Sequence, residues 1–268
     1  KRTTTVNSLN TTYYEPSKVT NTITKSGKSA TTETTFSTLT SSGYKTCHFT
    51  YPKTIKETGF YGELATTTNT YDGSYHLTKQ YTDYNVTNMY RQVEYSSYVG
   101  NKPGTVVTTQ KHKDDANTFT TKTTYTYNEK GKVAKMVENA STVPVTHDYE
   151  YNKFGNMLTH KVSASGITTV TTTFTYDATN RFVASEKSSA NSLIANYTYN
   201  ALGRLIKKQE GVSGSLLTTS YTYDAVGNLT KITYPDNTST TYTRGWGTMP
   251  YKRYRVTSTT SAQAPVIT

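Results

Sequence analysis

The chain has 268 residues, of which 33% are hydrophobic and 12% aromatic, and it carries a formal net charge of +11. The aromatic content argues against disorder, the single Cys47 excludes an internal disulfide, and no apolar run is long enough for a membrane-spanning helix. The cations are spread along the chain, so we attribute them to the solvated face of strands and expect no nucleic-acid partner and no membrane insertion.

Residues 1–120 are rich in threonine and tyrosine, which favour strands because branched and aromatic side chains pack well on a pleated surface. Tyr13-Tyr14, Tyr51, Tyr71-Asp72-Gly73 and Tyr95 recur as landmarks, and Tyr71 and Tyr95 are 24 residues apart. We expect degenerate Tyr/Thr-rich β repeats here. A separate Thr-rich β domain is the alternative.

Residues 121–245 contain about five copies of one motif, an aromatic residue, any residue, Tyr, then Asp or Asn, and three residues later Gly or Asn. The second aromatic and the Gly or Asn of the copies are Tyr127 and Gly131, Tyr151 and Gly155, Tyr176 and Asn180, Tyr199 and Gly203, and Tyr223 and Gly227. Spacings of 24, 25, 23 and 24 residues separate the tyrosines. Such constancy indicates a true repeat.

Each motif position has a physical reason. The two aromatics at i and i+2 project from one face of a strand. The Asp or Asn favours the first position of a type I turn, and the Gly supplies the left-handed backbone of a three-residue hairpin loop with a bulge. Asn180 is the non-glycine residue that tolerates this conformation best. An apolar residue two positions later restarts the strand; these residues are Val133, Met157, Phe182, Leu205 and Leu229.

Residues 246–268 form a Ser/Thr-rich, strand-like extension, as expected for a piece of a longer array. Trp246 is the aromatic outside the repeat and the candidate ligand platform, since an aromatic face with a polar edge suits a sugar ring. The repeated tyrosines instead predict ladders between stacked hairpins.

One motif period therefore predicts two strands and two turns. The expected fold is all-β, with repeated β-hairpins that form a continuous antiparallel curved or spiralling sheet. We expect a thin, tyrosine-rich layer instead of a thick aliphatic core.

Chemistry-bearing residues are sparse. The five histidines have no metal-ligand spacing, and His147 and Asp148 are adjacent and point to opposite faces of a strand. His112 with Asp114 and Asp115 is the best constellation and predicts a polar turn. The sequence thus predicts no catalytic residue, no metal site and no cofactor, and so a protein that is not an enzyme.

The motif Tyr197-Thr-Tyr-Asn-Ala-Leu-Gly203-Arg-Leu205, repeated at Tyr221 to Leu229, resembles the tyrosine-aspartate (YD) repeat of the Rhs-repeat family, which includes Rhs shell proteins, toxin-complex B and C components and teneurins. This resemblance implies a partial Rhs-type shell that is secreted or at the cell surface of a bacterium. Its implied partners are the remainder of its own longer polypeptide and an enclosed C-terminal toxin cargo. The self-cleavage motif of the family contains Asp-Pro, which is absent here, so no catalytic residue is carried over.

The leading expectation is a structural repeat segment that encapsulates or presents a C-terminal toxin or effector. The alternative is a cell-surface adhesin or glycan-binding module, with glycans as partner. A weaker third reading is an enzyme that lacks its catalytic segment.

Overall fold

The computed structural model describes the backbone of residues 1–10, 12, 14–41, 47–246 and 254–262, and the side chains of residues 1–10, 12, 14–37 and 50–243. The described residues contain strands and turns but no helix. The chain divides into two units, Lys1–Val145 and Thr146–Thr268. All strands belong to one antiparallel sheet. The predicted all-β architecture of repeated hairpins is confirmed.

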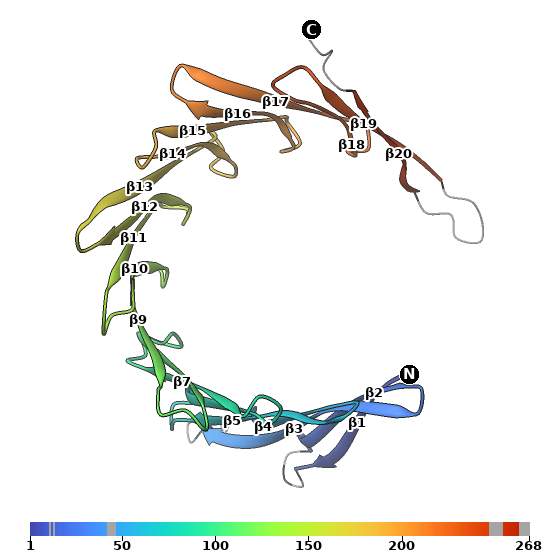
Figure 1. The fold of residues 1–268 in the computed structure, drawn as a ribbon, viewed down its shortest axis with the longest axis vertical. Coiled ribbons are helices and arrows are strands. Elements are labelled where there is room, and N and C mark those ends of the chain that lie inside the picture. The colour runs from blue at the N-terminus through green and yellow to red at the C-terminus, as the bar shows by residue number, and fades with distance from the viewer. Residues whose placement is uncertain (11, 13, 42–46, 247–253, 263–268) are drawn as a thin grey trace. The chain divides into compact units, whose positions relative to one another are not determined.

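In the first unit each strand pairs with the strands before and after it in sequence (Figure 1). The strands are β1 (Arg2–Leu9), β2 (Pro16–Lys25), β3 (Lys28–Ser41), β4 (Cys47–Gly59), β5 (Gly62–Tyr71), β6 (Leu77–Tyr84), β7 (Met89–Ser96), β8 (Thr105–His112), β9 (Phe119–Tyr127) and β10 (Val133–Glu138).

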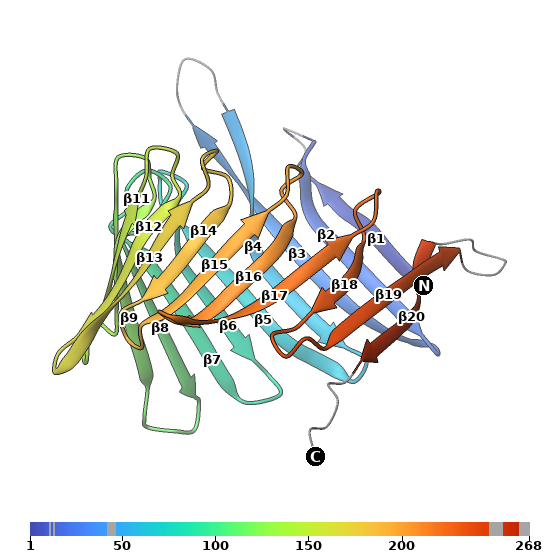
Figure 2. The ribbon, with the colours of Figure 1, turned by 90° about the horizontal axis from the view of Figure 1, so that it is seen from above.

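The second unit follows the same rule, and Figure 2 shows its strands side by side in sequence order. The strands are β11 (Val145–Tyr151), whose first residue lies at the unit boundary, β12 (Met157–Ala164), β13 (Ile167–Tyr176), β14 (Val183–Ser188), β15 (Leu193–Tyr199), β16 (Leu205–Val212), β17 (Ser215–Tyr223), β18 (Leu229–Thr233), β19 (Ser239–Trp246) and β20 (Tyr254–Ala262).

The sheet has almost no core of its own. The solvent-accessible surface is 17725 Å², whereas a compact monomer of 29.8 kDa would expose roughly 11,600 Å². Among the described residues, those that are buried are Ala65, Asn69, Val93, Gly104 and Thr240. Each unit is therefore a single layer whose two faces both remain accessible.

The two faces differ in character. In β9 the rings of Tyr125 and Tyr127 are half-buried, whereas Thr126 between them is exposed. The same alternation recurs at the end of β13, β15 and β17. Because side chains alternate along a strand, the motif aromatics share one face, here called the aromatic face, as predicted.

Candidate functional site

The Asn200 turn shows how the motif reverses the chain. The Asn200 N–H donates to the Arg204 carbonyl oxygen at 2.9 Å, and the Gly203 N–H donates to the Asn200 carbonyl oxygen at 2.9 Å. The side-chain oxygen of Asn200 accepts the N–H groups of Leu202 and Arg204, each at 3.0 Å. Gly203 has a φ of 76°. The result is a three-residue hairpin loop in which Asn200 satisfies the backbone ahead of it.

The same backbone bonds recur in the other copies, at Asn128, Asn152 and Asp224. The residue three positions after each Asp or Asn has a positive φ in all five copies: 70° at Gly131, 86° at Gly155, 56° at Asn180, 76° at Gly203 and 95° at Gly227. These five positions therefore adopt the left-handed backbone that the loop requires.

The third copy corrects one sequence-based alignment. The Asp177 N–H donates to the Phe182 carbonyl oxygen, and Tyr176 pairs with Val183, whereas Tyr199 pairs with Leu205. The loop is one residue longer, so the prediction that Phe182 restarts the strand was wrong, and Val183 does so. The Asp177 carboxylate makes the longer loop possible, because one oxygen accepts the N–H groups of both Arg181 and Phe182.

At five hairpins a tyrosine hydroxyl fastens the hairpin to the preceding one. Tyr223 donates its hydroxyl to the Leu205 carbonyl oxygen at 2.8 Å, and Tyr176 donates to that of Met157 at 2.8 Å. In the first unit the equivalent bonds run from Tyr71 to Pro52 at 3.1 Å, from Tyr98 to Leu77 at 2.5 Å and from Tyr127 to Pro103 at 2.8 Å. We call this bond the tyrosine pin. Burial raises the pKa of the hydroxyls of Tyr127, Tyr151, Tyr176 and Tyr199 above the usual value.

A second contact joins successive hairpins at the loop. A Cβ added to Gly203 would lie 2.3 Å from the Phe182 ring, which also stacks on Tyr199 with centroids 4.9 Å apart. In the next hairpin the Arg204 guanidinium occupies the space where a Gly227 Cβ would lie. Close approach to the Phe182 ring thus adds to the backbone requirement at Gly203, whereas at Gly227 the flexible Arg204 side chain could move and the backbone conformation is the requirement.

The first unit contains a complete hairpin of the same kind, which the sequence motif does not reveal. Asp72 accepts the N–H groups of Ser74 and His76 at 2.8 and 2.9 Å, and Tyr71 pairs with Leu77. Tyr75 occupies the glycine position with a φ of 69°. The pin to this hairpin comes from Tyr98, not from Tyr95, which the spacing had indicated. Asp72 was the one sequence signal that could have indicated this hairpin.

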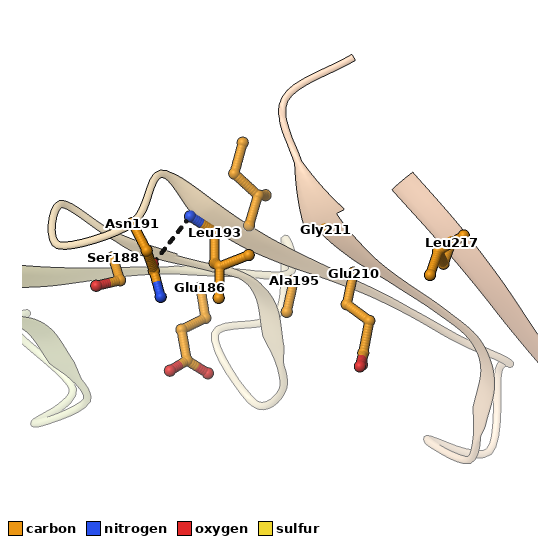
Figure 3. A pocket seen from close by; sticks show the side chains of 9 residues that line it. Glu186, Ser188, Asn191, Leu193, Ala195, Glu210, Gly211 and Leu217 are labelled. Carbon is orange, nitrogen blue, oxygen red and sulfur yellow. Dashed lines mark hydrogen bonds between the residues drawn. The ribbon is translucent and has the colours of Figure 1, made fainter. Parts of the chain in front are cut away.

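One hollow on the described surface lies on β14 to β17 and has a volume of about 410 Å³. Glu186 pairs across the sheet with Ala195, and Ala195 with Glu210. Figure 3 shows both carboxylates on the same side of the ribbon as Ala195. Burial raises the pKa of the neighbouring Tyr197, and the charge of Glu186 adds to the rise. The lining contains no histidine, cysteine or lysine, so it offers two carboxylates beside an aliphatic surface.

The remaining sequence candidates are dispersed. His112 lies at an exposed turn, 3.9 Å from Asp114. Trp246 ends β19, but its side chain lies outside the described residues. No cluster of three or more His, Cys, Asp or Glu residues that could hold a metal ion occurs in the part of the chain that the structure describes. Within the same residues no helix could span a membrane.

Comparisons with known proteins agree with this geometry. The family model described as the RHS Repeat matches residues 199–239 and 223–247, whereas no curated protein matches the chain. The crystal structure of TcdB2-TccC3-TEV aligns with a TM-score of 0.58 and 15% identity, over 84% of this chain and 12% of that one. The crystal structure of TcdB2-TccC3 aligns with a TM-score of 0.44 and 13% identity, over 86% of this chain and 16% of that one.

At 15% identity the first of these likenesses concerns the fold alone, and this chain spans only 12% of the length of that protein. The matched repeat contains the Tyr199 and Tyr223 hairpins, and the pin of Tyr223 has counterparts in both units. Residues 199–247 are therefore similar to the YD-repeat, or Rhs-repeat, family, and the chain is a structural repeat segment.

Proposed function

We propose that this segment is a length of wall in an Rhs-type shell that encloses a C-terminal toxin or effector polypeptide carried by the same, longer chain. The observation that carries this proposal is the tyrosine pin, which recurs at five hairpins of a sheet one layer thick. Each hairpin lacks a core and is held by its neighbours, so stability grows with repeat number and the layer can be extended without a change of design.

The large accessible surface favours a wall segment and argues against a compact domain. The chain exposes far more surface than a compact protein of its mass, and the aromatic face is only half-buried. A surface of this kind can face an enclosed polypeptide. The proposal includes secretion from a bacterium and a role without catalysis, with the rest of the polypeptide and its cargo as partners.

Protease protection tests the proposal. The longest polypeptide that contains this segment is digested with trypsin, and we expect its C-terminal region to resist cleavage while the same region expressed alone is cut rapidly. Deletion of residues 200–223, one whole period, should open the wall and expose the cargo. Equal cleavage rates for the enclosed and isolated C-terminal region would refute enclosure.

A second candidate, a glycan-binding surface, rests on Tyr75. A bulky residue at positive φ is a genuine outlier, and such strain concentrates at functional sites. The Tyr75 ring lies nearly parallel to Tyr51, at 7° with centroids 6.4 Å apart, and Tyr51 also contacts Tyr71 at 4.9 Å. A glycan array probed with the chain and with Tyr75→Gly tests this function. Glycan binding by the unmodified chain that is lost in the variant would support this function. Absence of glycan binding by the unmodified chain would reject it.

A further inference from the structure

The first hairpin of the second unit brings together two histidines that are 13 residues apart in sequence. His147 in β11 and His160 in β12 lie with Nδ1 of the former 3.0 Å from Nε2 of the latter. The ring centroids are 5.2 Å apart and the planes differ by 16°. The two nitrogens therefore face each other edge to edge and share one proton in a hydrogen bond.

A neighbouring ring restrains this pair. Tyr149 stacks on His160 with centroids 4.7 Å apart and planes 6° apart, and it lies 6.3 Å from the His147 ring at 11°. Burial lowers the pKa of His160 below its ordinary value, and the His147 ring lowers it further. Burial thus favours the neutral form of the imidazole, which is the form that binds metals.

We propose that His147 and His160 form a two-histidine site for one divalent transition-metal ion, with water at the remaining positions. Two nitrogen ligands at about 2.0–2.1 Å from an ion lie about 2.9 Å apart at a right angle and about 3.4 Å apart at a tetrahedral angle. The observed separation of 3.0 Å falls in this range. On binding, the shared proton moves to the other nitrogen of its ring, so that both facing nitrogens can bind the ion.

The surroundings define the kind of ion. Asp148 and Lys161, next in sequence to the two histidines, project from the opposite face of the sheet, and Thr172 lies across from His160 on β13. Among the residues that the structure describes, no carboxylate joins the two histidines in a metal-binding cluster. Imidazole ligands favour Cu²⁺, Ni²⁺ and Zn²⁺, with Cu²⁺ bound most tightly and Mn²⁺ most weakly. Ca²⁺ and Mg²⁺, which require oxygen ligands, should not bind. This inference is independent of the proposed shell.

Metal titration of the whole untagged chain tests the site. We expect isothermal titration calorimetry with CuCl₂ to give one ion per chain, and electron paramagnetic resonance of the equimolar complex to show two nitrogen ligands. MgCl₂ should give no heat of binding. A spectrum with fewer than two nitrogens overturns the proposal without any variant, as does the absence of Cu²⁺ binding.

Variants then locate the ion. His147→Gln and His160→Gln should each weaken Cu²⁺ binding by at least roughly tenfold, whereas His112→Gln, at an exposed turn, should leave it unchanged. Equal binding by the His147→Gln, His160→Gln double variant would place the ion elsewhere and overturn the assignment. If circular dichroism shows that a variant does not fold, the number of nitrogen ligands in the spectrum of the unmodified chain tests the proposal instead.

Discussion

The hydroxyl of Tyr223 donates to the carbonyl oxygen of Leu205, in the preceding hairpin, across 2.8 Å. The bond joins the last residue of β17 to the first residue of β16. A side chain from one repeat thereby satisfies the backbone of the repeat before it. The periodicity of the sequence is thus a periodicity of contacts between hairpins.

Removal of one tyrosine pin should lower stability. Tyr223→Phe should reduce the free energy of unfolding by about 1 kcal/mol, because the carbonyl oxygen of Leu205 loses a partly buried donor. Urea denaturation provides the measurement. Tyr221→Phe is the matched control, since the Tyr221 hydroxyl has no hydrogen-bond partner among the described residues. If Tyr221→Phe lowers the free energy of unfolding as much as Tyr223→Phe does, the role of the pin is contradicted.

The close approach at Gly203 separates steric from backbone effects. Gly203 and Gly166 have φ values of 76° and 75°, but a Cβ would meet Phe182 only at Gly203 and open space at Gly166. Gly203→Ala should therefore destabilise by about 1 kcal/mol or more beyond Gly166→Ala. Thermal melts measure the stability loss of each variant. In a Phe182→Ala background the difference between the two losses should become smaller. Identical losses in the native background would argue against the contact.

Asn180 tests the loop conformation itself. Asn180→Gly removes the cost of a positive φ but also the bond from the Asn152 amide at 3.2 Å. The two effects oppose each other, so the net change should stay within about 0.5 kcal/mol. Asn180→Val should cost more than about 1 kcal/mol because a β-branched residue resists this backbone. Chemical denaturation compares them, and similar losses would rule out the left-handed assignment.

The Asp177 loop should make stability depend on acid pH. The Phe182 N–H, the Thr179 hydroxyl and further backbone donors lower the pKa of Asp177 from 3.8 to about 2. Because the folded pKa is depressed, the charged carboxylate stabilises the fold above pH 4, and this contribution disappears between about pH 4 and pH 2. A carboxyl NMR titration measures the pKa. Asp177→Asn, which copies the Asn of three other loops, should flatten this part of the melting profile; an unchanged profile would exclude Asp177 as its source.

His160 should govern a separate pH window. Burial and the nearby His147 lower its pKa below 6.5, so the folded chain binds fewer protons than the unfolded chain as the pH falls. Stability should therefore be fully present above about pH 6.5 and decline below it. Thermal melts in a chelating buffer measure the decline, and His160→Gln should reduce it. A melting temperature that stays constant between pH 7 and pH 5 would contradict this linkage.

The repeat was readable because its turn residues are chemically constrained. Asp or Asn at the start of the loop and Gly at its end indicated the hairpins of Gly131, Gly155, Gly203 and Gly227, and the spacing of the aromatics indicated their shared face. These features depend on neighbouring residues in one strand or turn, which is the information that local sequence carries best.

Contacts between hairpins were not readable in the same way. The pin acceptors Pro52, Met157 and Leu205 contribute only a backbone oxygen, so their side chains give no signal. The Asp72 hairpin was obscured because Tyr75 stands where glycine was expected. The register at Phe182 depends on which backbone groups one carboxylate accepts, and residue spacing does not reveal that choice. The meeting of His147 and His160 likewise required the register of two strands.

The extra residue in the Asp177 loop has an evolutionary consequence. Tyr176 stays opposite Val183 although the loop is longer, so a codon gained in a turn is absorbed there. A codon gained inside a strand would move every later side chain to the wrong face. Lineages that carry this array should therefore accumulate length polymorphism in the turns and exchange whole hairpins by recombination, while the strands keep their length.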